Sequence, residues 1–382
     1  MKLTEEEKKI LDTYDAVKIG IIGFTGESEE LVHKNPDGGV PCAVKFAVQE
    51  AFENRKLPRR VEFIYKVENG LPQGSALNSV KAYHELCDEG CLLVVGPHSS
   101  DNIYMMKDAS DERKVPVISW AGSESLSGEY LFRLGNGDCG GDPALIAQWV
   151  EKKGYRKIGV IEEICPNGEE YMRYFKFECR ERDLLVCATE TLNQFDGPET
   201  VEAALQRLKD AGTEVVVYIG YGYLLAQNML NPAFKAIGWD PARITTTAFM
   251  YYLKGYEFFE GWVGIDQDCP DNKLRQHFAE KFFEAYKDKL YLAYRQDWLN
   301  GVQLLSYDTG RVIAEALFRA PVLTPEGVKK GLERIRWMPS AVGGNNNHIS
   351  CSAYEHNMYS GDWLCYGKIQ NGKLEFEGLY ND

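Results

Sequence analysis

The sequence predicts an α/β protein made of two doubly wound, Rossmann-like lobes. Short β-branched segments alternate with longer segments of helical period, a pattern typical of a parallel sheet with crossover helices. The same order of segments occurs twice, and KIGVIEE at 157–163 in the second copy echoes KIGIIGF at 18–24 in the first. The chain of 382 residues also exceeds what one hydrophobic core usually serves. We therefore expect two lobes, with ligand bound between them beyond the carboxyl ends of the strands.

The first copy is predicted to contain four strands and three helices. Its helices carry apolar residues on one face, as Val44, Ala47, Val48, Ala51 and Phe52 do in the first of them. The expected order is strand 17–23, helix 39–56, strand 61–67, helix 73–90, strand 91–97, a short helix from about residue 101, and strand 115–121. Glycines and a proline between 135 and 143 then indicate a change of direction.

The second copy begins after a helix at 144–153. The expected order is strand 157–163, helix 168–182, strand 184–191, helix 198–211, strand 214–220, helix 222–237 and strand 243–249. Residues 259–268 are interpreted as an extended crossing, followed by helices at 271–287, at 297–319 and from Thr324. The last 40 residues are expected to form a loop and hairpin strands.

The order of these elements predicts two lobes joined by a hinge of three chain segments. Lobe 1 is expected to comprise 17–136 and about 267–341, and lobe 2 to comprise 137–266 and about 342–382. Residues 1–16 form an N-terminal extension, which lacks the apolar region and cleavage site of a secretory signal. The chain is therefore either cytoplasmic or a secreted protein from which the signal is missing.

The composition excludes several classes of partner. The net charge of −14 disfavours nucleic acid and anionic lipid, both of which need clustered Lys and Arg. No segment approaches the roughly 20 consecutive apolar residues of a membrane-spanning helix. Ten cysteines are too few for a disulfide scaffold and form no CxxC pair, so most are expected to be buried small apolar residues.

Hydroxyl groups follow two adjacent strands of the first lobe. GPHSSDN at 96–102 places Ser99 and Ser100 between a strand end and a helix start, where free N–H groups favour an anion. A simple helix-capping role for this segment is the structural alternative. SWAGSES at 119–125 repeats the arrangement with the backbone of Ala121 and the hydroxyl of Ser123. We expect a polar corner that suits a carboxylate.

Aromatic residues follow the matching strands of the second lobe. Aromatic side chains offer apolar contact area, and a tyrosine or tryptophan adds a polar group at its tip. We expect only two or three of these residues to face a ligand and the others to serve in packing. The candidates are Tyr221, Tyr223, Phe249, Tyr251 and Tyr252, with Trp120 on the rim of the first lobe.

Catalytic and cofactor patterns are weak. The glycines of GIIGFTG lack the spacing of a dinucleotide fingerprint, and acidic residues follow them. The six histidines show no HExxH spacing, and His348, Cys351 and His356 lack the second cysteine pair of a zinc site. Glu162 and Glu163 end a strand of lobe 2, where they could line the cleft, but they are interpreted as a solvated pair at the strand end. We therefore expect no enzyme, no cofactor and no metal.

Seven segments together resemble the type I periplasmic binding proteins, specifically the leucine/isoleucine/valine-binding branch of ABC transporter solute-binding proteins. The resemblance runs from about residue 17 to the end of the chain. It is carried by VKIGIIGFTG (17–26), VVGPHSS (94–100), VPVISWAGS (115–123), YLFRLGNGD (130–138), KIGVIEE (157–163), LQRLKDAGTEVVVYIGYG (205–222) and FKAIGWDP (234–241).

The resemblance implies roles for several residues. Ser100, Ala121 and Ser123 match the positions that hold the carboxylate of the ligand in that family. The family's acid for an α-ammonium is missing, because no acid lies between Arg243 and Glu257. Asn167 occupies approximately the position of a tyrosine that is common in the family after the first strand of lobe 2. A disulfide that is frequent in lobe 1 of the family is missing here, because its two positions fall near Asn69 and Ser99.

The implied function is capture of a small carboxylate, with hinge closure recognised by the membrane subunits of an ABC transporter. The ligand could be an amino acid. An aromatic or hydrophobic carboxylic acid or amide agrees better with the absence of an acidic side chain in the protein, because burying an ammonium without a carboxylate partner costs several kcal/mol. The expected location is periplasmic or extracellular. The alternatives are a cytoplasmic ligand-sensing regulator with the same fold and, third, a nucleotide-using α/β enzyme.

Overall fold

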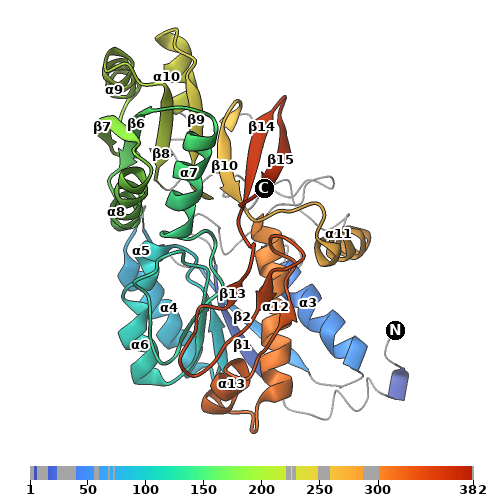
Figure 1. Ribbon diagram of the computed structural model, residues 1–382. Helices are drawn as coiled ribbons and strands as arrows, with labels where there is room; N and C mark the ends of the chain where they lie inside the picture. Colours follow the sequence, from blue (N-terminus) through green and yellow to red (C-terminus); the bar gives the residue numbers. More distant parts are fainter. Residues whose placement is uncertain are drawn as a thin grey trace. The chain divides into compact units, whose positions relative to one another are not determined.

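Two compact units make up the protein, which was analysed as a computed structural model (Figure 1). Unit 1 comprises Met1–Asn136 and Pro270–Trp363, and unit 2 comprises Gly137–Cys269 and Leu364–Asp382. The structure describes residues 4–6, 16–23, 40–55, 60–67, 69–71, 74–220, 225, 229–247, 259–286 and 301–380.

The first part of unit 1 is a doubly wound sheet. Its elements are β1 (Val17–Ile22), α3 (Val40–Arg55), β2 (Val61–Lys66), α4 (Ala76–Asp88), β3 (Leu93–Val95), α5 (Ser100–Ile103), α6 (Met106–Arg113), β4 (Val117–Ser119) and β5 (Leu131–Arg133). The strands pair in the order β2-β1-β3-β4-β5, and all of these pairings are parallel. All their carboxyl ends therefore lie at one edge of the sheet, which is where ligands bind in open α/β sheets.

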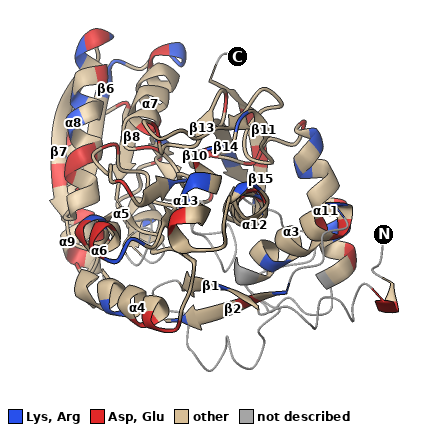
Figure 2. Cartoon of the chain, turned by 90° about the horizontal axis from the view of Figure 1, so that it is seen from below, with Lys and Arg blue, Asp and Glu red and all other residues tan. Residues whose placement is uncertain are grey.

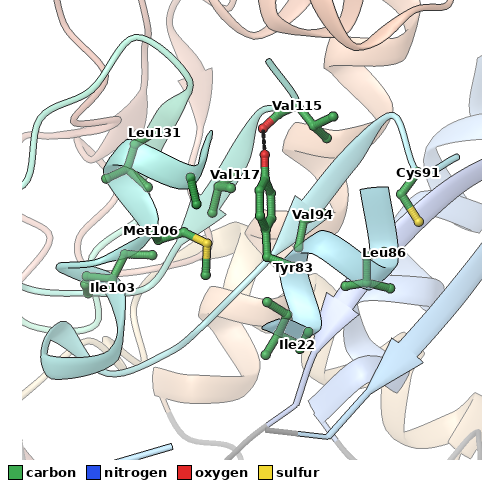
Figure 3. Close-up of a cluster of buried hydrophobic side chains, with 13 residues drawn as sticks. Ile22, Tyr83, Leu86, Cys91, Val94, Ile103, Met106, Val115, Val117 and Leu131 are labelled. Carbon is green, nitrogen blue, oxygen red and sulfur yellow. Dashed lines mark hydrogen bonds between the residues drawn. The ribbon is translucent and has the colours of Figure 1, made fainter. Parts of the chain in front are cut away.

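The core between this sheet and helices α4, α5 and α6 is apolar (Figure 3). Leu86 of α4 and Val94 of β3 are fully buried there. Tyr83 is fully buried too, and its hydroxyl donates a 2.8 Å hydrogen bond to the carbonyl of Val115, which satisfies the only polar atom of its side chain. At about 2 kcal/mol for each large apolar side chain, this burial fixes α4 and the start of α5 against the strand ends.

The C-terminal part of unit 1 packs on the same lobe. It comprises α11 (Lys273–Tyr286), α12 (Gly301–Arg319), α13 (Pro325–Leu332) and a small antiparallel sheet of β11 (Met338–Pro339), β12 (His348–Ile349) and β13 (Tyr359–Ser360). Helix α12 is buried along most of its length and lies beside α3 (Figures 1 and 2). A Cβ on Gly310 would lie 2.3 Å from the carbonyl oxygen of Val44, so only glycine permits this close helix contact.

Unit 2 contains a seven-stranded mixed sheet. Its elements are α7 (Gly141–Lys152), β6 (Lys157–Glu163), α8 (Pro166–Glu181), β7 (Leu185–Leu192), α9 (Pro198–Asp210), β8 (Val215–Ile219), α10 (Asn231–Ala236), β9 (Ala242–Thr245), β10 (Val263–Asp266), β14 (Cys365–Gln370) and β15 (Lys373–Leu379). The strand order is β15-β14-β10-β9-β8-β6-β7. The β14–β15 hairpin and its pairing with β10 are antiparallel, and the pairings from β10 to β7 are parallel.

The predicted α/β fold, with two doubly wound sheets built mainly of parallel strands, is confirmed, with three differences in detail. Just before the predicted change of direction at 135–143, residues 131–133 form the short strand β5, which was not predicted and pairs with β4. The predicted extended crossing at 259–268 contains β10, which joins the sheet of unit 2 beside β9. The strand predicted at 115–121 is shorter, because Trp120 and Ala121 leave the ladder. Most of 222–230 and the interval 287–300, both of which include residues predicted as helix, lie outside the described residues.

Candidate ligand-binding site

The first pair of predicted serines lies where β3 leads into α5. Ser99 is the N-cap of α5, and its carbonyl accepts hydrogen bonds from the N–H groups of Asn102 (3.1 Å) and Ile103 (3.2 Å). Ser100 is the first residue of the helix and is 4% exposed. The Asn102 side chain in turn bonds both backbone groups of Leu71, which anchors this helix start to the loop after β2. Both serines therefore lie at the carboxyl edge of the sheet of unit 1.

The hydroxyl of Ser119 joins this strand end to the next one. It accepts a hydrogen bond from the N–H of Ala121 (3.0 Å) and donates one to the carbonyl of Pro97 (3.4 Å). The N–H of Ala121, which the resemblance assigns to the carboxylate, is thus bonded inside the protein in this structure. Ligand contact through this N–H would require the Ser119 hydroxyl to share or release it.

Ser123 is fully buried and lies in a small hydroxyl cluster. Its Oγ contacts the hydroxyl of Tyr104 at 3.2 Å and that of Ser125 at 2.9 Å. Because Tyr104 directly follows α5, this contact brings the two predicted serine segments to the same corner of unit 1. Hydroxyl hydrogens rotate to suit their partners, so this cluster can reorient toward an anion at little cost.

Trp120 lies inside unit 1 and not at its rim, which corrects the predicted placement. The side chain is 1% exposed, and its indole N–H donates a 2.9 Å hydrogen bond to the hydroxyl of Thr309 in α12. Its ring packs 4.2 Å from that of His98. Burial lowers the pKa of His98 to about 3, so this imidazole is neutral at ordinary pH. The packed rings of His98 and Trp120 therefore join the two strand ends that carry Ser99 and Ala121.

Arg133 supports the corner, although nothing in the sequence pattern singled it out. Its side chain is buried at the end of β5, and Nη1 donates to the carbonyls of Gly122 (3.0 Å) and Ser123 (2.8 Å). Nη2 pairs with Glu124 at 2.5 Å. The guanidinium therefore fixes the loop that carries Ser123. The sequence feature that could have indicated this role is the position of the arginine inside the apolar run YLFRL, where a charged side chain needs a buried partner.

Asn136 is a second residue that the sequence prediction missed. It follows β5, and its N–H donates to the carbonyl of Trp120 at 2.7 Å, which places it beside the end of β4. The side chain is 6% exposed, yet neither Oδ1 nor Nδ2 has a hydrogen-bond partner among the described residues. A buried carboxamide without partners costs about 1 to 3 kcal/mol, so a ligand that bonds it gains this amount.

In unit 2, Asn167 lies in the first turn of α8. Cys165 caps this helix, because its Sγ accepts a hydrogen bond from the N–H of Gly168 at 3.2 Å. The Oδ1 of Asn167 accepts one from the thiol of Cys139 at 2.9 Å. Asn167 is half-buried and lies just beyond the carboxyl end of β6.

The interpretation of Glu162 and Glu163 as a solvated pair is wrong for Glu163. Its side chain is 2% exposed and accepts a 2.6 Å hydrogen bond from the hydroxyl of Tyr218 in β8. Burial raises the pKa of Glu163 to about 7, although the bond from Tyr218 opposes that rise. Strand alternation explains the difference, because Glu163 shares the face of β6 that packs on Tyr218 while Glu162 points away from it.

Asp142 organises a second buried cluster in unit 2. Its Oδ2 accepts hydrogen bonds from the N–H and hydroxyl of Thr247, both at 2.9 Å, and from the hydroxyl of Tyr171 at 3.2 Å. Complete burial raises its pKa to about 6 despite these bonds. The cluster ties the first turn of α7 to the residues that follow β9. The predicted aromatic residues Tyr221, Phe249 and Tyr251, with Tyr223 and Tyr252, lie outside the described residues.

The described residues contain no group of three or more His, Cys, Asp or Glu side chains arranged to hold a metal. His348 stacks on Trp337 at 4.1 Å, and His356 stacks on Phe132 at 4.0 Å. The thiol of Cys351 bonds the carbonyl of Glu355. Within the same residues, none of the helices has the length and apolar character needed to cross a bilayer.

Comparison with known families decides the classification. A family model described as periplasmic binding protein matches residues 43–363, which is most of the chain. The chain belongs to the periplasmic binding protein family. The resemblance to periplasmic binding proteins seen in the sequence is thereby confirmed. The comparison with curated proteins gave no significant match.

Solved structures of this family share the fold at low sequence identity. A type 1 periplasmic binding protein from Bordetella pertussis is 19% identical, with a TM-score of 0.74 over 95% of this chain and 100% of that one. A leucine-binding protein from Thermotoga maritima is 18% identical, with a TM-score of 0.72 over 95% and 98% of the two chains. A solute-binding protein of an ABC transporter from R. palustris, in complex with benzoate, is 15% identical, with a TM-score of 0.71 over 96% of each chain.

Proposed function

We propose that this protein is the solute-binding component of an ABC transporter of the branched-chain amino acid type and that it captures a small organic carboxylate or amide. The observation that carries the proposal is the polar corner of unit 1. There the Ser119 hydroxyl joins two strand ends, and Tyr104 brings Ser123 to the start of α5. Family membership supports a binding role and not a catalytic one.

Neutral donors are suited to a carboxylate in this corner. Ser100 and Ser123 offer hydroxyl groups, and Ser99, Ala121 and Asn136 offer further polar groups around them. Hydrogen bonds to a charged acceptor are worth about 1.5 to 3 kcal/mol each, so two or three of them offset the desolvation of one carboxylate. Asn136 can donate and accept, which also suits a primary amide.

The class of ligand follows from unit 2. The sequence has no acid between Arg243 and Glu257, so the usual counter-charge for an α-ammonium is missing. A hydrophobic or aromatic acid needs no such counter-charge. Asn167 and the aromatic residues Tyr221, Phe249 and Tyr251 are proposed to contact the body of this ligand, while Trp120 supports the corner from inside unit 1. Among the structural neighbours, one protein binds leucine and another was solved with benzoate.

Transport requires that binding be signalled to the membrane subunits. We propose that ligand favours a closed arrangement of the two lobes, 17–136 with about 267–341 and 137–266 with about 342–382, about the three-segment hinge. The membrane subunits of the transporter would recognise this closed form. The periplasm or cell exterior is the proposed location, and no metal, cofactor or nucleic acid takes part.

A thermal-shift screen followed by calorimetry tests this function. The screen compares leucine, benzoate, benzamide and cyclohexanecarboxylate, and we expect benzoate or the aliphatic acid to stabilise the protein more than leucine does. Ser100→Ala combined with Ser123→Ala should weaken binding of that acid by about tenfold or more. If no carboxylate or amide stabilises the protein, the function is refuted. If the double variant binds as tightly as the parent, the site is wrong even where the function is right.

A further inference from the structure

Unit 1 has a second hollow that the proposed function does not use. It has a volume of about 390 Å³, the size of a small-ligand pocket. It is lined by Ala47, Glu50, Ala51, Asn54 and Arg55 of α3, Leu274 and His277 of α11, Tyr307, Arg311, Glu315, Phe318 and Arg319 of α12, and Arg336 and Met338. Arg55 ends α3 just before β2 begins, so this part of the hollow faces the amino edge of the sheet. The polar corner lies at the opposite, carboxyl edge.

The hollow is positively charged in a chain whose net charge is −14. Four arginines and two glutamates line it, which gives a formal charge of +2 with His277 neutral. Asp308, which pairs with Arg311 at 3.0 Å, still leaves a positive excess of one. A concave surface of one sign concentrates ligands of the opposite sign.

Both glutamates in the hollow already have partners. Glu50 accepts a hydrogen bond from the hydroxyl of Tyr307 (2.6 Å) and contacts Nε2 of His277 (2.9 Å). Glu315 lies between Arg55 and Arg319, each at 2.5 Å. Neither carboxylate therefore remains to neutralise the other arginines.

Guanidinium donors remain available around the hollow. Each guanidinium has five N–H groups, and the Nη2 groups of Arg311, Arg319 and Arg336 donate to no described residue. Aromatic rings hold two of the arginines in place. Arg55 stacks 4.3 Å from the centre of Phe318, and Arg311 lies 5.7 Å from that of Tyr307. Such planar, pre-positioned donors suit bidentate binding of carboxylate or phosphate oxygens.

We infer that this hollow is a binding site for a small anion that carries at least two carboxylate or phosphate groups. One acidic group is bound by the Nη2 donors of Arg311 and Arg336. Another is bound by Nη2 of Arg319 together with the N–H groups of Arg55 that do not contact Glu315. The apolar side chains of Phe318 and Met338 contact the part of the ligand between its acidic groups. This site is independent of the proposed transport ligand, because it shares none of its residues with the polar corner.

Calorimetry at constant ionic strength tests the site with citrate and with inorganic pyrophosphate as separate probes. We expect one molecule to bind per chain, whereas acetate and chloride do not saturate the site. The probe that binds more tightly tells whether carboxylate or phosphate is the natural group. Arg55→Gln should weaken binding of that probe by about tenfold, because one charge-assisted contact is lost. Asn54→Glu retains every arginine, adds an acidic group on an exposed position of α3, and should weaken binding to a similar degree.

Two control variants separate specific binding in the hollow from a general loss of positive charge and from binding in the polar corner. Arg113→Gln removes a comparable arginine of unit 1, which pairs with Asp88 at 2.6 Å outside the hollow, and should leave binding unchanged. Ser100→Ala with Ser123→Ala should also leave it unchanged. Absence of saturable binding by both probes overturns the inference. So does an equal loss in Arg113→Gln, or a loss confined to the serine variant, which would place the anion in the polar corner.

Discussion

Replacing Glu163 by glutamine should remove a pH-dependent cost to the stability of unit 2. The side chain is buried, and its carboxylate accepts a hydrogen bond from the hydroxyl of Tyr218. Glutamine has the same shape and retains an oxygen that accepts this bond. The substitution therefore removes the titration of the group while keeping its packing. Gly220 packs against both side chains, since a Cβ there would lie 2.4 Å from Oε2 of Glu163 and 2.6 Å from the Tyr218 hydroxyl.

The magnitude follows from the pKa of the carboxyl group in the two states. Burial raises the pKa of Glu163 from 4.5 to about 7 in the folded chain. A carboxyl with a raised pKa holds its proton more tightly when folded, so its contribution favours folding below pH 4.5 and is lost as the pH rises toward 7. At about 1.4 kcal/mol per pH unit, the loss amounts to up to about 3 kcal/mol.

Thermal unfolding at several pH values measures this loss. Between pH 4.5 and pH 8 the parent should lose up to about 3 kcal/mol relative to Glu163→Gln, or roughly 6 to 12 °C in melting temperature for a unit of this size. Taking the difference between the two proteins cancels the contribution of Asp142, which has a raised pKa as well. Glu162→Gln, on the other face of β6, is the matched control and should show a much smaller difference. A difference between parent and Glu163→Gln that does not change with pH would refute the reasoning.

Two further substitutions test the packing of unit 1. Gly310→Ala should lower the free energy of unfolding, measured in urea, by about 1 to 3 kcal/mol, because the new Cβ would overlap the carbonyl of Val44. At an uncrowded helix position the same change stabilises, so a more stable variant would contradict the observed helix contact. Arg133→Met should lower the free energy of unfolding by about 3 to 5 kcal/mol and weaken carboxylate binding, because the loop carrying Ser123 loses its support. Unchanged affinity in the folded variant would show that the loop does not depend on the guanidinium.

Sequence reasoning predicted the sheets because their strands are continuous apolar runs. Every residue of β8, Val215–Ile219, is buried, and such a run bounded by turn residues is typical of an interior strand. Strand β5 was not predicted, because three residues before a glycine-rich segment carry no periodicity. The inclusion of β10 in the sheet of unit 2 depends on pairing with β9 and β14, and pairing between distant segments is invisible in a local pattern.

The candidate site was predictable only in part. Serines at the ends of adjacent parallel strands must lie at one edge of a sheet, so the positions of Ser100 and Ser123 followed from the strand pattern alone. The burial of Glu163 was not predictable, because it depends on the hydroxyl of Tyr218 in another strand. Arg133 and Asn136 were also missed, since their roles depend on backbone groups in other segments of the chain.

The net charge of −14 implies that the two proposed anion sites work in different ways. Long-range attraction cannot draw an anion to the protein as a whole, and charges are screened beyond about 8 Å at physiological salt. In the polar corner the buried guanidinium of Arg133 is already paired with Glu124. The choice of ligand there depends on how well hydroxyl and amide groups of the protein replace the water around the carboxylate of the ligand. The arginine-lined hollow instead keeps an excess of positive charge. Affinity in the hollow should therefore fall steeply with ionic strength, while affinity in the corner should depend mainly on the shape and apolar area of the ligand.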